Sequence, residues 1–236
     1  MDRTAVADRI ASGLGLDVPV IRLAFVDGAP AGVPQVTQAV PAACSFWRTA
    51  ETSVFYATAA QHFNCPIGAM TMGFELPEEV QLQVMGAVTM MCEAGYLSPD
   101  EPATMPTTGR KAAGIVYGPL ADLPVEPDLL LLWLTPRQAM VYSEAIGTSR
   151  WTTAEPATVW GRPACAALPS AMTTGRSALS FGCTGMRTFT GVREDRLLAA
   201  LPGPQAGALA DALAAVNRAN TTMLTYYEAR KAAFTS

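Results

Sequence analysis

Cysteine is the residue type in this chain best suited to chemistry. The segment HFNCPIGAM (62–70) contains the only histidine, His62, and places Cys65 three positions after it. Pro66 follows and suits the first turn of a helix, where free backbone N–H groups lower a thiol pKa and favour the thiolate. We therefore expect Cys65 to bind a metal or to react. The alternative is that it is a small apolar residue of the core.

The setting of Cys65 is echoed elsewhere in the chain. Alanine precedes both Cys44 and Cys165, and phenylalanine stands two residues before both Cys65 and Cys183. This echo predicts an internal duplication, in which a pseudo-two-fold axis brings these four cysteines towards a shared centre. Cys92 has no counterpart and is expected to fill the core.

Four thiolates around one centre suit an iron–sulfur cluster or Zn²⁺. No CxxC pair occurs, so the local motifs of zinc ribbons and ferredoxins are absent. A chain with an apolar core of its own hardly needs a structural zinc. The leading hypothesis is therefore a 4Fe–4S cluster, either as an oxidoreductase centre or, with three cysteine ligands, as a Lewis acid. Its expected partners are a small-molecule substrate or an electron donor.

Two further side chains could bind a substrate or a cofactor. His62 could be an acid–base group, a ligand or the axial ligand of a haem, which gives a second hypothesis. Arg187, four residues after Cys183, could balance a negative cluster or hold an anionic substrate. The alternatives are that His62 only caps backbone groups and that Arg187 only forms a salt bridge at the surface. A third hypothesis is a metal-free module that binds small molecules and whose cysteines only pack.

Hydrophobic periodicity predicts the elements that must position these residues. Strands are predicted at 18–26, 53–58, 114–118, 129–134, 178–182 and 196–203, and helices at 1–16, 41–50, 78–93 and 137–147. The Ala-rich C-terminal segment is also predicted to be helical, with an interruption at Asn220.

These elements predict a single α/β or α+β domain, residues 1–236, built from two pseudo-repeated halves. Each half runs strand, cysteine helix, strand and cysteine loop. The predicted halves are 15–95 and 127–203, joined by a proline-rich connector at 96–126 and followed by a C-terminal helix at 204–234.

Composition excludes several classes of protein. Half of the residues are hydrophobic, 15% are charged and the net charge is −4, which argues against disorder and against nucleic-acid binding. LLLLWL (129–134) is too short to cross a bilayer, so no membrane partner is expected. The number of cysteines is odd, and the charged N-terminus does not resemble a signal peptide, so we expect a cytoplasmic protein. The sequence leaves open whether the protein forms oligomers.

Several motifs together resemble a known family. They are HFNCPIGAMTMGF, the central YGPL, PDLLLLWLTPRQAM, ACAALPSAM and SFGCTGMRTFTGVREDRLLAALPG. Over residues 15–203 the chain resembles the prokaryotic domain of unknown function 169. The resemblance implies a shared fold and a cysteine site, with family positions that match Cys44, Cys65, Cys165, Cys183 and Arg187. It implies no reaction.

Overall fold

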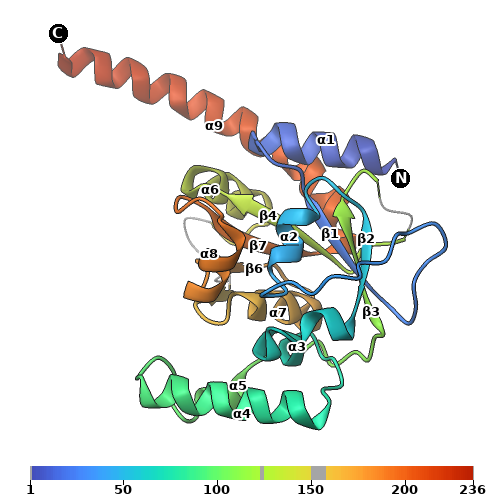
Figure 1. Ribbon diagram of the computed structural model, residues 1–236. Coiled ribbons are helices and arrows are strands. Elements are labelled where there is room, and N and C mark those ends of the chain that lie inside the picture. The colour runs from blue at the N-terminus through green and yellow to red at the C-terminus, as the bar shows by residue number, and fades with distance from the viewer. Residues whose placement is uncertain (1, 123–124, 150–157, 236) are drawn as a thin grey trace.

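A seven-stranded sheet forms the centre of the molecule, with helices on both of its faces (Figure 1). The computed structural model describes residues 2–122, 125–149 and 158–235. The strand order is β2-β3-β1-β4-β7-β6-β5, and every neighbouring pair is antiparallel except the parallel pair β5 and β6. The strands are β1 (Ile21–Val26), β2 (Phe55–Thr58), β3 (Gly114–Pro119), β4 (Leu129–Leu134), β5 (Thr158–Trp160), β6 (Ala178–Ser180) and β7 (Leu197–Pro202).

Strand β4 is buried on both faces, which explains its unbroken run of apolar residues. Leu129, Leu131 and Trp133 point into one hydrophobic cluster. Their neighbours Leu130 and Leu132 point into a second cluster on the opposite face. The sheet is therefore the middle layer of a mixed α/β domain, with a core on each side.

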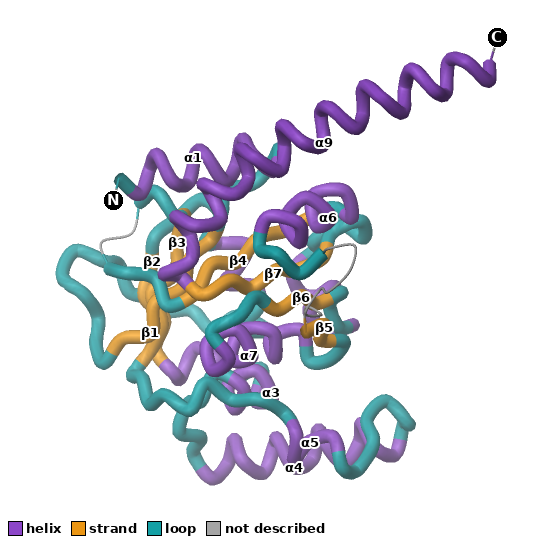
Figure 2. Tube along the Cα trace, turned by 180° about the vertical axis from the view of Figure 1, so that it is seen from behind, coloured by secondary structure: helices purple, strands orange, loops and turns teal. Residues whose placement is uncertain are grey.

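One face of the sheet is covered by α1 (Arg3–Leu14), α6 (Pro136–Ala145) and the first part of α9 (Ala206–Thr235). Helices α1 and α9 lie side by side in both views (Figures 1 and 2). Asn220, expected to interrupt the last helix, instead donates a hydrogen bond to Glu144 of α6. Beyond that contact α9 continues away from the domain, with every residue from 221 to 234 exposed.

The opposite face carries short helices whose starts hold the cysteines. They are α2 (Ser45–Thr49), α3 (Pro66–Thr71), α7 (Ala167–Thr174) and α8 (Thr184–Thr190). Each of these helices follows a strand in the chain, so connections far apart in the sequence meet above the same face. This is the arrangement on which the candidate site depends.

A hairpin of two helices, α4 (Glu78–Glu93) and α5 (Glu101–Thr104), lies apart from the layers, beyond α3 (Figures 1 and 2). Helix α4 has the bounds that the sequence predicts, but Val80 is its only buried residue among those described. Leu82, Met85 and Met90 of α4 are more than half exposed. This helix is therefore held at its ends and along one side only.

The predicted fold class agrees with the structure at the level of a mixed α/β domain with a C-terminal helix. The segment 96–126, expected to be a connector, contains β3, which pairs with both β1 and β2 inside the sheet. Strand β5 is not predicted from sequence, because a three-residue edge strand carries too little periodicity. None of the described helices has the length and hydrophobicity to cross a membrane.

Candidate functional site

Four of the five cysteines line one cavity of about 380 Å³. They are the four that the sequence predicts to converge: Cys44, Cys65, Cys165 and Cys183. The cavity opens on the face of the sheet that carries the short helices, and the α4–α5 hairpin forms its outer wall. A cavity of this size is in the range that binds small ligands.

Each of these cysteines sits at the beginning of a helix. Cys44, Cys65 and Cys183 are the residues immediately before α2, α3 and α8, and Cys165 lies in the 3₁₀ turn Ala164–Ala166 that leads into α7. The backbone N–H of Met186 donates to Sγ of Cys183 over 3.4 Å. Free N–H groups at helix starts favour negative charge, so the positions suit thiolates bound to a metal.

The sulfur atoms of Cys65 and Cys165 approach one another across Gly68. A β-carbon built on Gly68 would lie 3.1 Å from Sγ of Cys65 and 3.9 Å from Sγ of Cys165. Cys183 is close enough to raise the pKa of Cys44, Cys65 and Cys165, and Cys65 contributes to the raised pKa of both Cys44 and Cys165. The four thiols therefore form one electrostatically coupled group.

Burial, rather than the helix starts, sets the protonation of Cys44, Cys65 and Cys165. It raises the pKa of Cys44 to about 12, with a further contribution from the neighbouring cysteines. It also raises the pKa of Cys65 and raises that of Cys165 well above the ordinary value. The expectation that a helix start makes Cys65 a free thiolate is wrong, because desolvation of the charge outweighs the partial charge of a short helix. Without a metal the thiols of Cys44, Cys65 and Cys165 are protonated at neutral pH.

His62 lies behind the cavity wall rather than in it. Its side chain is fully buried, Nδ1 donates to the carbonyl of Thr58 over 2.7 Å, and Nε2 accepts from the Tyr117 hydroxyl over 2.9 Å. Burial lowers the pKa of His62 to about 4. Both ring nitrogens are used within the protein, so in this arrangement His62 has no atom free for a haem or a substrate. Its contact with the cavity is indirect, through Tyr117, whose ring lines it.

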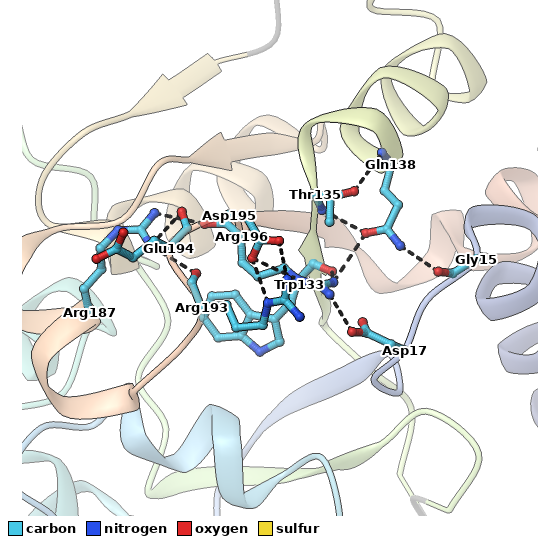
Figure 3. Close-up of polar contacts among 10 residues, drawn as sticks. All are labelled: Gly15, Asp17, Trp133, Thr135, Gln138, Arg187, Arg193, Glu194, Asp195 and Arg196. Atoms are coloured by element: carbon cyan, nitrogen blue, oxygen red, sulfur yellow. Dashed lines mark hydrogen bonds and ion pairs between the residues drawn. The ribbon is translucent and has the colours of Figure 1, made fainter.

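Arg187 fixes a loop and does not line the cavity. Its guanidinium donates to backbone carbonyls on both sides of α8, as Figure 3 shows for three of the four. The acceptors are Phe181, Arg193, Glu194 and Arg196. These bonds hold the two ends of the segment 181–196 together. Arg187 thereby positions the helix that begins after Cys183.

The sulfur atoms are not grouped closely around a single point. Among the residues that the structure describes, no set of three or more histidine, cysteine, aspartate or glutamate side chains is arranged to hold a metal ion. A tetrahedral Zn²⁺ requires sulfur atoms about 2.3 Å from one centre. The observed arrangement is therefore wider than a single-ion site.

Sequence reasoning missed the outer part of the cavity. Tyr96 and Leu97 come from the α4–α5 hairpin, and Trp160 and Arg162 come from the end of β5. No motif marks these residues, and they meet only because the hairpin folds back over the short helices. Cys92, expected in the core, is half-buried on α4 and belongs to neither main core cluster nor to the cavity wall.

Comparison with known proteins identifies one family. The family model described as DUF169, "Uncharacterised ArCR", matches residues 9–212, which confirms the resemblance seen in the sequence motifs. No curated protein and no solved structure gives a significant match. The match covers the whole sheet and all four cavity cysteines.

Proposed function

Because the chain belongs to the DUF169 family, whose function is uncharacterised, we propose a function from the site itself: the protein binds an iron–sulfur cluster through Cys44, Cys65, Cys165 and Cys183. The observation that carries this proposal is the convergence of these four cysteines on one cavity. They come from four separate helix starts, and Cys92 alone lies elsewhere.

A cluster sets a different requirement on the positions of the sulfurs from that of a single ion. In a cluster each thiolate binds a different iron, so the ligands stand further apart than around one Zn²⁺. The cavity between the cysteines provides room for the inorganic core, and Gly68 keeps backbone and side-chain atoms out of the space beside Cys65 and Cys165. The wide arrangement that does not suit one ion is therefore compatible with a cluster.

The surroundings supply what a cluster site needs. Met72 and Met186 are buried apolar residues of the cavity wall, and such residues shield a cluster from water and tune its potential. The backbone N–H of Met186, which already donates to Cys183, would remain a donor to the bound thiolate. When bound, the cluster would supply one-electron redox chemistry to an electron donor or a small-molecule substrate. The five unpaired cysteines fit a reducing compartment such as the cytoplasm.

We also propose that the two cysteine pairs descend from an internal duplication. The strand order supports this proposal. Outward from the contact between β1 and β4, the strands run β1, β3, β2 in one direction and β4, β7, β6 in the other. The last strand of each set in the chain, β3 or β7, thus lies next to the first. Cys44 and Cys165 then take equivalent places, and so do Cys65 and Cys183. In this scheme β3 belongs to the first half, so the repeat extends beyond residue 95.

A metal-free module for binding small molecules is the second candidate. It is favoured by the apolar wall of the cavity and by the protonated state of the buried thiols. Under this reading the cysteines contribute apolar surface only. Haem binding has less support, because both nitrogens of His62 are already hydrogen-bonded.

Anaerobic purification with iron and sulfide analysis separates the candidates. A cluster protein contains stoichiometric iron and acid-labile sulfide and shows broad visible absorbance, whereas haem gives a sharp Soret band. Serine replacement of each cavity cysteine is expected to lower the iron content severalfold, and Cys92→Ser is the matched control that leaves it unchanged. A folded, colourless protein that takes up no iron and sulfide on anaerobic reconstitution would refute the cluster and leave the metal-free module.

A further inference from the structure

The cavity extends well beyond the four cysteines, and its outer part has a composition of its own. This outer chamber is lined by Trp160 and Arg162 from the domain and by residues of the hairpin, which are Ala87, Val88, Met91, Tyr96, Leu97, Glu101, Pro102, Thr104 and Met105. Aromatic and aliphatic carbon dominates this lining. A chamber with few polar groups at fixed places is the usual form of a small-molecule site.

The inner side of α4 is the first sign that the chamber holds a ligand. Val88 and Met91 line the cavity yet are only half-buried, although α4 contacts α3. The helix thus spans a space without filling it. An apolar ligand in the chamber would remove these side chains from water at about 25 cal/mol for each Å² that it covers.

One cation lines the chamber in the described part of the chain. It is Arg162, whose side chain is exposed to solvent. Its guanidinium carbon lies 4.2 Å from the centre of the Tyr96 ring, so it joins the domain to the hairpin. Within those described ranges no carboxylate forms an ion pair with it. The one carboxylate among the described lining residues, Glu101, accepts a hydrogen bond from the backbone N–H of Ser98 over 2.6 Å.

We propose that the outer chamber binds a small organic acid with a flat or chain-like apolar body. The apolar body lies between Met91 and Trp160, and the acidic group pairs with Arg162, whose planar guanidinium suits a carboxylate or sulfonate. The acid then projects towards solvent while the opposite end of the molecule points towards the cysteines. The binding of this ligand does not depend on the proposed function. Its role as the substrate of the site does rest on the proposed function.

Two fluorescent probes that differ in charge test the proposal on the full-length, metal-free, reduced protein. 8-Anilino-1-naphthalenesulfonate has an aromatic body with an acid, and N-phenyl-1-naphthylamine has nearly the same body without one. Both are expected to bind saturably. Arg162→Gln is expected to weaken the binding of the sulfonate probe about fivefold and to leave the affinity for the neutral probe unchanged.

Two methionines of the same helix provide a matched control. Met91 lines the chamber, whereas Met85 is 65% exposed and does not line the cavity. Met91→Ser is expected to weaken the binding of both probes severalfold, whereas Met85→Ser is expected to leave the binding of both unchanged. Equal melting temperatures of the two variants exclude unfolding as the cause. Equal losses in the two methionine variants, or no saturable binding to the wild type, would overturn the proposal. Equal weakening of both probes by Arg162→Gln would overturn the recognition of an acid.

Metal analysis of the same preparations keeps the two proposals apart. Probe binding in a protein that never takes up iron and sulfide would establish the ligand chamber and remove the cluster. Conversely, a cluster protein that binds neither probe, in its loaded or metal-free form, would remove the chamber and leave the cluster in place.

Discussion

Gly68 and Cys65 are packed so closely that a β-carbon at residue 68 would stand 3.1 Å from Sγ of Cys65. The glycine is part of α3, and the three atoms nearest to such a β-carbon belong to the side chains of Cys65 and Cys165. The absence of a side chain at residue 68 therefore keeps open the space between two of the four sulfurs.

Gly68→Ala is expected to reduce iron incorporation severalfold while changing the free energy of unfolding by less than about 1 kcal/mol, because only one sulfur atom has to move. Metal analysis and chemical denaturation measure the two quantities. Gly86→Ala in α4 is the matched helical control, since nothing lies within 4 Å of a β-carbon there. It should leave iron content unchanged and stabilise the protein by about 0.5–1 kcal/mol. Unchanged iron in Gly68→Ala would argue against a cluster between these sulfurs.

Burial of His62 makes the free energy of unfolding depend on pH in the acidic range. The pKa of His62 is about 4 in the folded protein and 6.5 in the unfolded chain, so the unfolded chain binds more protons between these values. The contribution of neutral His62 to the free energy of unfolding is therefore fully present above pH 6.5. It is lost, by on the order of 3 kcal/mol, as the pH decreases to about 4. Denaturation in urea across this range measures the loss.

His62→Gln retains a donor and an acceptor for Thr58 and Tyr117 but has no titrating group. Its unfolding free energy is expected to be lower at pH 7 and flatter between pH 6.5 and 4 than that of the wild type. The same slope in both proteins would show that another group causes the acid sensitivity.

Burial of the thiols predicts slow alkylation of the metal-free protein. With a pKa of about 12 instead of 9.0, Cys44 has about a thousandfold less thiolate at pH 8, and the thiolate is the nucleophile. Iodoacetamide is expected to modify Cys44 and Cys165 at least about tenfold more slowly in the folded than in the denatured protein. Mass spectrometry of each cysteine peptide gives the rates. Rapid reaction at both sites would mean that the cavity thiols are ionised and accessible.

Arg196 anchors the start of β7 to the N-terminal segment, as Figure 3 shows. Its nearly buried guanidinium lies 2.5 Å from a carboxylate oxygen of Asp17 and donates to the carbonyl of Trp133. Arg196→Gln is expected to cost about 1–3 kcal/mol of unfolding free energy, because the buried carbonyl of Trp133 loses a charged donor and the ion pair with the half-exposed Asp17 is removed. Arg193→Gln, which removes an exposed ion pair with Asp195, should cost less than about 1 kcal/mol. Similar costs for both would contradict a structural role specific to Arg196.

The sequence determined the local elements wherever one pattern was strong. The apolar run 129–134 forms a strand with those bounds, because both of its faces are buried, and PEEV marks the start of the helix at 78. The repeated setting of the cysteines also predicted that Cys44, Cys65, Cys165 and Cys183 would converge, and all four line one cavity. Cys92, expected in the core, is instead half-buried on α4.

Only the tertiary structure decided the electrostatic state of the site. A cysteine before a helix predicts a thiolate, but burial by distant segments raises the pKa of Cys65 instead. Neither the pairing of His62 with Tyr117 nor the loop contacts of Arg187 can be read from spacing, since the partners of His62 and Arg187 are set by packing. The same holds for the outer chamber, where Tyr96 and Arg162 meet through the folding of a hairpin. Periodicity reports which residues are apolar, whereas desolvation and contact depend on which segments come together in space.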